Sequence, residues 1–207
     1  MSISRLTWAV VGLALTVSSG ATAQTIFDEW ANVKTPAAPA AKPATVDAKT
    51  TALLMLDFME QNCGKRPRCV ASEPKVKKLL DSARQAGAHV VYAIIANTTT
   101  ADVLKSLAPK PDEPWVQSGV DKFFKTDLEK ILSDKKINTV IVVGTAAHGA
   151  VLYTASGAAL RGMNVVVPVD GVSSSDLFSE QYTAWHLANA PVISPKVTIT
   201  TTDLVKF

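Results

Sequence analysis

Histidine and cysteine, the side chains that most often bind transition metals, are scarce in this sequence. The three histidines (His89, His148 and His186) are far apart, and the two cysteines (Cys63 and Cys69) have no cluster of further Cys or His residues behind them. A zinc site needs three or four such ligands brought together, usually at short and regular spacing. The sequence therefore predicts no metal site, and we expect no cofactor.

A large excess of positive charge is also missing. Lys and Arg total 21 against 18 Asp and Glu, a formal net charge of +3, and removing an N-terminal segment that carries only Arg5 would reduce it by one to +2. No stripe of basic residues interleaved with aromatic residues is present. Such a balance provides little attraction for a polyanion, so the sequence argues against a nucleic-acid partner.

An apolar stretch of the roughly 20 residues that a membrane-spanning helix needs is absent. The apolar run Trp8–Val17 is too short for an anchor, follows the positive charge of Arg5 and precedes the small-residue sequence Ala21-Thr-Ala23. These are the three parts of a signal peptide. We expect residues 1–23 to be cleaved off after Ala23, the protein to be periplasmic or secreted, and the mature chain to have no membrane contact.

Both cysteines lie in the eight-residue stretch Asn62–Cys69. In an exported protein an even, closely spaced pair forms a disulfide that fixes a surface loop, and we expect this for Cys63 and Cys69. The alternative is that Cys63 is a reactive thiolate whose pKa is lowered by basic neighbours. These neighbours are Lys65, Arg66 and Arg68.

The composition changes between the cleavage site and the first predicted strand. Residues 24–50 begin with a predicted short helix, Thr25–Lys34, and continue with the Ala/Pro-rich tract Thr35–Thr45. Such a tract forms an extended, semi-rigid tether. Trp30 either docks on the domain or on a neighbouring subunit, or belongs to an exposed tail. Residues 51–207 are expected to form a single domain.

Apolar runs and amphipathic stretches alternate beyond residue 50. Strands are predicted at 51–56, 89–95, 140–143, 164–169 and 197–200. Helices are predicted at 75–86, 102–107, 126–134, 148–160 and 175–188, with a Pro-rich loop at 109–118. This order predicts an α/β fold, a three-layer Rossmann-like parallel sheet with helices on both faces. Its functional crevice should lie beyond the carboxyl ends of the strands, where Asp57 and the turn Gly144–Ala150 are located.

The segment around this turn combines a buried strand, small residues and the start of a helix. Four β-branched residues form the strand Val140–Val143, and helix is predicted from about His148. Backbone N–H groups at such a helix N-terminus converge on one point and favour developing negative charge there. A nucleophile usually stands on the first turn of the helix. The residue at that place is Ala150, which has no reactive side chain.

The sequence of residues 144–155, GTAAHGAVLYTA, resembles the signature G-x-A-T-x-x-C-V-x-x-T-A of the isochorismatase-like (cysteine hydrolase) superfamily. Three further stretches match motifs of that family in order: Thr51–Asp57, Phe123–Leu128 and Arg161–Ser174. The resemblance covers about residues 51–204 and implies the α/β fold described above. It also implies a divergent member, because the position of the catalytic Cys is Ala150.

The thiol enzymes of this family use an Asp, a Lys and a Cys together. The resemblance places Asp57 at the position of the Asp. The family Lys falls near Gln117 or Ser118, neither of which is a lysine, and Lys122 is the nearest replacement. Lys122 either takes that role or is a surface lysine paired with Asp121. The resemblance therefore implies Asp57 and Lys122 as the catalytic candidates, and the absence of a thiol at Ala150 argues against a thiol mechanism.

Loss of the Cys does not by itself end activity in this family. The isochorismatases proper have a small residue there and cleave a vinyl ether with the Asp as general acid. The resemblance implies that the turn could bind a polar group of a substrate, and the candidate binding residues are Ala146, His148, Gly149, Ala150 and Gln117. A neutral His148 either contacts a ligand or caps the turn by a backbone hydrogen bond.

Three functions stay open. The first is an exported non-thiol hydrolase of a small molecule that uses Asp57 as acid and base. The second is a catalytically silent relative that binds a small ligand or a protein partner in the inherited pocket. The third is a structural subunit, because family members commonly form homo-oligomers; the aromatic side chains available for such an interface are Tyr153, Phe178 and Trp185.

Overall fold

The computed structural model describes residues 24–207, and the expected signal peptide lies outside them. The chain divides into an N-terminal unit that ends at Pro36 and a larger unit, Ala37–Phe207. In the N-terminal unit the short helix α1 (Ile26–Glu29) begins where the Asp28 carboxylate accepts hydrogen bonds from the backbone N–H and hydroxyl of Thr25. The helix continues as a 3-10 turn that carries the exposed Trp30.

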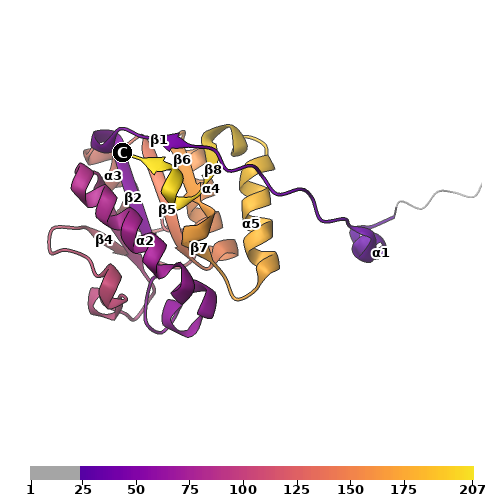
Figure 1. Ribbon diagram of the computed structural model, residues 1–207, viewed down its shortest axis with the longest axis horizontal. Coiled ribbons are helices and arrows are strands. Elements are labelled where there is room, and N and C mark those ends of the chain that lie inside the picture. Colours follow the sequence, from indigo (N-terminus) through magenta and orange to yellow (C-terminus); the bar gives the residue numbers. More distant parts are fainter. Residues whose placement is uncertain (1–23) are drawn as a thin grey trace, which may run out of the picture. The chain divides into compact units, whose positions relative to one another are not determined.

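The larger unit is built on a parallel sheet with the strand order β4-β3-β2-β5-β6-β8, and β7 pairs with the end of β5 (Figure 1). Its strands are β2 (Thr51–Leu56), β3 (His89–Ile94), β4 (Trp115–Gln117), β5 (Thr139–Thr145), β6 (Asn164–Pro168), β7 (Val172–Ser173) and β8 (Val197–Thr200). The chain proceeds from β2 toward one edge of the sheet and from β5 toward the other. The strand order therefore reverses between β2 and β5, which is where parallel sheets of this kind bind ligands.

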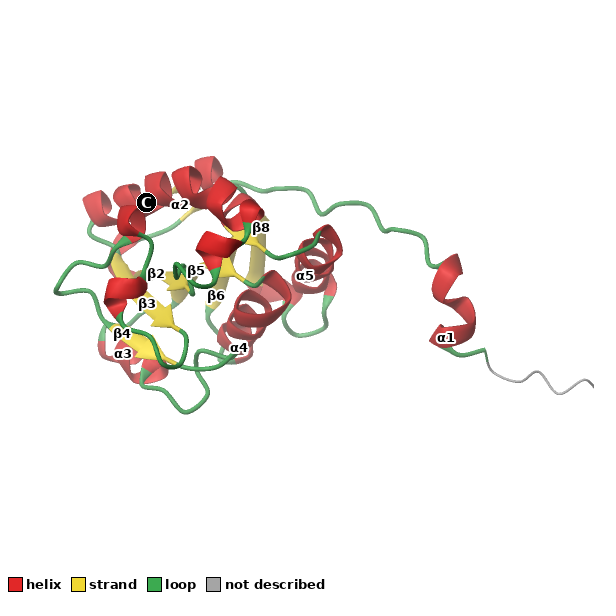
Figure 2. Ribbon diagram, turned by 90° about the horizontal axis from the view of Figure 1, so that it is seen from below, coloured by secondary structure: helices red, strands yellow, loops and turns green. Residues whose placement is uncertain are grey.

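Helices cover both faces of this sheet (Figure 2). They are α2 (Pro67–Ala86) on one face, and α3 (Leu128–Asp134), α4 (Leu152–Leu160) and α5 (Leu177–Asn189) on the other. The predicted α/β fold with helices on both faces is confirmed.

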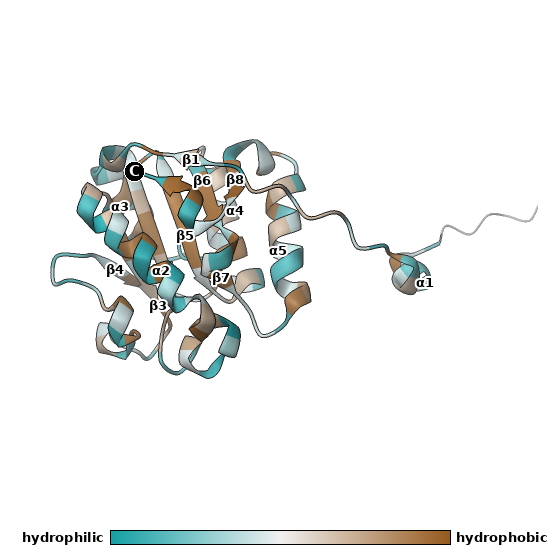
Figure 3. Ribbon diagram, in the orientation of Figure 1, coloured by the Kyte–Doolittle hydropathy of each residue, from teal (hydrophilic) through white to brown (hydrophobic). Residues whose placement is uncertain are grey.

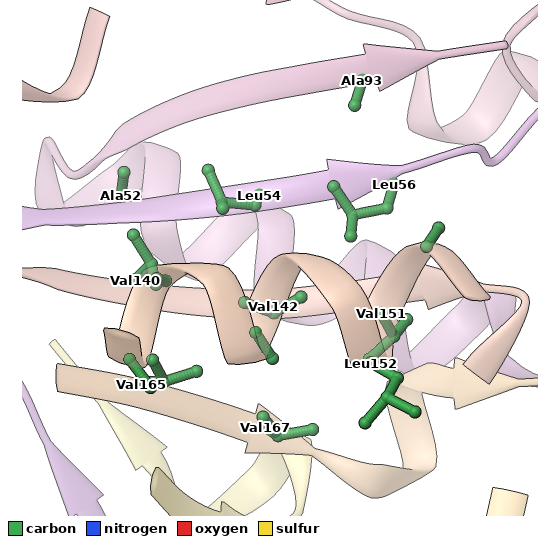
Figure 4. Close-up of a cluster of buried hydrophobic side chains, with 14 of the residues drawn as sticks. Ala52, Leu54, Leu56, Ala93, Val140, Val142, Val151, Leu152, Val165 and Val167 are labelled. Carbon is green, nitrogen blue, oxygen red and sulfur yellow. The ribbon is translucent and has the colours of Figure 1, made fainter. Parts of the chain in front are cut away.

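Alternate side chains of the strands enter two separate hydrophobic clusters, one on each face. Along the fully buried β2, Leu54 and Leu56 pack on the side of α4, whereas Leu53 and Met55 pack on the side of α2. Figure 4 shows the first cluster, in which Leu54 of β2 and its paired residue Val142 of β5 lie beside α4. In Figure 3 the central strands are correspondingly hydrophobic along their length. Each such side chain contributes about 1.5–3 kcal/mol by its burial, which stabilises the strands whose ends carry the site.

Several elements differ from the sequence-based expectation. Helix α2 begins at Pro67 rather than Lys75, and the predicted loop 109–118 contains the edge strand β4. The predicted helix 102–107 is instead two 3-10 turns, at Thr100–Asp102 and Lys105–Leu107.

Residues 37–50, which the composition placed in a linker, belong to the larger unit. In that stretch β1 (Ala44–Thr45) pairs with β9 (Val205–Lys206), and the Lys42 N–H donates to the carbonyl of Ile199 at 2.9 Å.

Between residues 24 and 207, no helix combines the length and the apolar composition needed to cross a membrane. In the same part of the chain, no three His, Cys, Asp or Glu side chains come together as a metal ion would require.

Candidate active site

Asp57 is the first residue beyond β2 and lies at the point where the strand order reverses. Its N–H donates to the carbonyl of Ala93 at 2.9 Å, which continues the pairing of β2 with β3 by one residue. Its φ of 56° is in the left-handed region, which aspartate tolerates better than most residues. Its side chain is only 7% exposed, so the carboxyl group is held inside the protein rather than in water.

Lys122 is the partner of this carboxyl group. Its side chain is fully buried, and the Nζ atom donates to both Asp57 carboxylate oxygens, Oδ1 and Oδ2, at 2.8 Å each and to the Gly119 carbonyl at 2.8 Å. An ammonium group has three N–H donors, so all of its donors have acceptors here. The backbone N–H of Lys122 donates to Thr154 Oγ1 on α4 at 3.3 Å. The alternative in which Lys122 is a surface lysine paired with Asp121 is therefore wrong.

Burial governs the protonation of Asp57. The loss of solvation raises the pKa of this carboxyl group from 3.8 to about 6, against the opposing charges of Lys122 and Arg66. A carboxyl group with a pKa near the working pH can both donate and accept a proton efficiently. The group therefore has the electrostatic properties of a general acid and base.

The register of β2 and β5 brings the turn after β5 next to Asp57. Leu56 pairs with Gly144, so Asp57 and Thr145 follow directly from paired positions. At Gly144, which has a φ of 149°, a Cβ atom would lie 2.3 Å from the Leu56 carbonyl oxygen. No other residue allows this close approach, which explains the glycine. The next peptide bond, Thr145–Ala146, is cis.

Ala150 lies in a π-helical turn, Ala147–Val151, that leads into α4. The residue is 3% exposed, and its methyl side chain offers no nucleophile. Within the turn, the Ala146 carbonyl accepts hydrogen bonds from the N–H groups of Gly149 at 3.1 Å and Val151 at 3.3 Å. The Gly149 N–H is thus already bonded inside the turn.

Two other candidate binding residues make contacts within the protein. The imidazole Nδ1 of His148 lies 3.0 Å from Ser174 Oγ, which connects the turn to the segment after β7. His148 is otherwise exposed. The Gln117 side chain donates to the carbonyls of Ile95 at 3.1 Å and Thr98 at 2.9 Å. It orders the loop that follows β3.

Cys63 and Cys69 form a disulfide, as expected, and both are fully buried. The alternative in which Cys63 is a free thiolate is therefore wrong. The disulfide connects the 3-10 turn Cys63–Lys65 to the first turn of α2, and the loop that it closes begins six residues after Asp57.

Arg66, inside the disulfide loop, is a site residue that the sequence analysis considered only as a neighbour of a thiol. Its Nη1 atom donates to Thr145 Oγ1 at 2.9 Å, and that hydroxyl donates to the Ser173 carbonyl at 3.1 Å. The Arg66 charge also opposes the rise of the Asp57 pKa. The only signal in the sequence was the position of a basic residue between two cysteines that follow Asp57 closely.

The amino-acid sequence of this chain is similar to those of known proteins. The sequence model of the isochorismatase domain matches residues 51–197. An uncharacterised isochorismatase family protein of Bacillus subtilis, YaaI, is 26% identical over 80 residues, which are 38% of this chain and 44% of that protein. The aligned region thus spans less than half of that relative.

Solved structures of three proteins have a similar fold. An isochorismatase-like hydrolase from Alkaliphilus metalliredigens has a TM-score of 0.67 at 23% identity, over 74% of this chain and 94% of that one. The nicotinamidase of Staphylococcus aureus has a TM-score of 0.62 at 21% identity, over 68% and 92% of the two chains. The N-carbamoylsarcosine amidase of Thermoplasma acidophilum has a TM-score of 0.63 at 20% identity, over 74% and 97%. At these identities the likeness establishes the fold.

Proposed function

This chain belongs to the isochorismatase family, and we propose that it is a hydrolase that works through the Asp57 carboxyl group without a thiol nucleophile. The observation that carries the proposal is the buried pair of Asp57 and Lys122 at the strand-order reversal, with a carboxyl pKa of about 6. A mechanism that starts with protonation needs an acid of this kind, and it needs nothing at position 150. Ala150 is compatible with that requirement.

The chemistry that fits this site is the hydrolysis of a vinyl ether. Protonated Asp57 donates its proton to the terminal enol carbon, where the electron pair of the C=C bond forms the new C–H bond. The adjacent carbon becomes an oxygen-stabilised cation, and a water oxygen adds to it while a proton of that water returns to Asp57. The resulting hemiketal separates into a ketone and an alcohol, so that one water is consumed and the acid is regenerated.

Lys122 has a defined role in this reaction. When Asp57 gives up its proton, the carboxylate that forms lies 2.8 Å from the Lys122 ammonium at both oxygens. A fixed positive charge in a buried site stabilises such a developing charge without reorganisation. The Gly119 carbonyl holds the ammonium in place through its own 2.8 Å hydrogen bond.

The pH dependence of turnover tests this proposal. Isochorismate serves as the vinyl ether probe, and nicotinamide as an amide whose cleavage in this family relies on the thiol. We expect isochorismate to be hydrolysed, at a rate that falls as the pH rises above about 6, because the acid form of Asp57 is then lost. The fall should approach about tenfold for each pH unit. Nicotinamide should not be hydrolysed.

A second function, that of a catalytically silent binding protein, is favoured by one specific observation. Both carboxylate oxygens of Asp57 are hydrogen-bonded to Lys122, so a substrate must compete with a satisfied ion pair. The same assay separates the two functions. A silent protein would bind isochorismate in a calorimetric titration without converting it at any pH, whereas the hydrolase releases product.

A further inference from the structure

The Arg66 guanidinium group has more hydrogen-bond donors than its surroundings use. Its side chain makes the 2.9 Å bond to Thr145 Oγ1 and, among residues 24–207, no other hydrogen bond and no ion pair. A guanidinium group has five N–H donors in a planar fork. Arg66 is partly exposed, so a ligand can reach its remaining donors.

The backbone of Arg66 is fixed on both sides by the disulfide loop. Its N–H donates to the Cys63 carbonyl at 2.9 Å, and its carbonyl accepts hydrogen bonds from the N–H groups of Cys69 at 2.9 Å and Val70 at 3.1 Å. The disulfide joins the two ends of the same loop. The backbone that carries the Arg66 side chain therefore needs no ordering when a ligand binds.

The charges at the strand ends do not cancel. Asp57 and Lys122 neutralise each other in their ion pair, and the Arg66 charge, which acts on Asp57, remains without a counter-ion among the described residues. Arg68 in the same loop is different, because it forms two hydrogen bonds and an ion pair with Glu180. One uncompensated positive charge thus lies beside the acid.

We propose that Arg66 binds a carboxylate group of the molecule that reacts at Asp57, which makes the substrate a small organic anion. This inference rests on the proposed function for its link to turnover, but the binding it describes does not require turnover. A carboxylate fits because its two oxygens match the planar guanidinium fork and its single charge balances the single free charge. A phosphate dianion would bring a second negative charge next to Asp57.

The geometry also sets where the carboxylate lies. Arg66 is hydrogen-bonded to Thr145, which lies beside Asp57 because Gly144 pairs with Leu56. A ligand whose carboxylate is bound by Arg66 therefore places its neighbouring atoms at the turn and at the acid. Arg66 would select anionic substrates and orient them.

Benzoate and benzamide test the inference because they share a ring and a size and differ in charge. Binding is measured by calorimetric titration of each probe into the full mature protein. We expect the unchanged protein to bind benzoate about tenfold more tightly than benzamide, or better, as a charge-assisted contact implies. Arg66→Gln should abolish this preference by weakening benzoate alone. Arg66→Lys, which keeps the charge without the fork, should retain part of it.

Arg68→Gln is the matched control, since it removes a guanidinium from the same loop whose donors are already bonded to Glu180. This variant should keep the preference for benzoate. Equal binding of the two probes by the unchanged protein, or no binding of either, would overturn the proposal. It would also be overturned if Arg68→Gln matched the loss in Arg66→Gln, or if inorganic phosphate bound more tightly than benzoate. Benzoate binding without hydrolysis of isochorismate would reject only the proposed function.

Discussion

Replacement of Asp57 by asparagine is expected to reduce the hydrolysis of isochorismate by about a hundredfold or more while the fold is retained. The amide keeps the size of the carboxyl group and can still accept a hydrogen bond from Lys122, but it has no proton to give near pH 6. The measurement is the rate of product formation, at a temperature where circular dichroism shows the variant to be folded.

Asp170→Asn is the matched control for this substitution. Asp170 follows β6 at the same edge of the sheet, but its carboxylate accepts hydrogen bonds from the N–H of Thr202 at 2.8 Å and from its hydroxyl at 3.1 Å. It also lies 3.3 Å from Lys75 Nζ. These contacts order the C-terminal segment, so this variant should lose some stability and keep its turnover. Unchanged turnover in Asp57→Asn would move the chemistry to other residues.

Replacement of Lys122 by methionine is expected to destabilise the protein by about 3–5 kcal/mol at pH 9, which is far above the Asp57 pKa of about 6. Methionine fills much of the space of the lysine stem, so the main effect is a buried Asp57 charge without a counter-ion. The free energy of unfolding, measured by urea denaturation, reports the loss. Lys130→Met should cost less than about 1 kcal/mol, because the ion pair of Lys130 with Asp134 is exposed.

The pH dependence of this loss has a definite sign. Without Lys122, the pKa of buried Asp57 should rise further above its ordinary value of 3.8, since burial is then less opposed. A group whose folded-state pKa is raised binds its proton more tightly in the folded protein, so stability is lost as the pH rises through that pKa. The destabilisation relative to the unchanged protein should therefore shrink as the pH is lowered toward about 6, below which Asp57 is protonated in both folded proteins.

The double variant Asp57→Asn with Lys122→Met should be more stable than Lys122→Met alone, because no buried charge remains. An equal loss in the two proteins would mean that the methionine disturbs packing and that the ion pair contributes little.

Much of the fold could be predicted because its core strands are encoded locally. The apolar run 51–56 has the bounds of β2, and the β-branched run 140–143 lies inside β5. The start of α2 was missed because Pro74, which usually ends a helix, lies within it. The edge strand β4 was missed because it has only three residues and follows a Pro-rich loop.

In the candidate site, the sequence could predict the position of a single residue but not the contacts between residues far apart in the chain. Asp57 could be recognised from its place after an apolar strand, in a motif that matches a family. The resemblance left open whether Lys122 acts with Asp57 or pairs with Asp121. The sequence could not decide this, because Lys122 and Asp57 are 65 positions apart and their contact depends on how the segment from Gly119 folds back to β2. The contact of Arg66 with Thr145 spans 79 positions and depends on the disulfide loop in the same way.

Direct titration of the Asp57 carboxyl group tests the central claim, that burial gives this residue a proton to donate near neutral pH. The measurement is the carboxyl 13C chemical shift of Asp57 as a function of pH, assigned by comparison with Asp57→Asn. We predict a midpoint near the pKa of about 6, raised from 3.8 by burial. A midpoint at or below 3.8 would mean that the ion pair with Lys122 outweighs burial and keeps Asp57 ionised, and it would contradict its role as the acid.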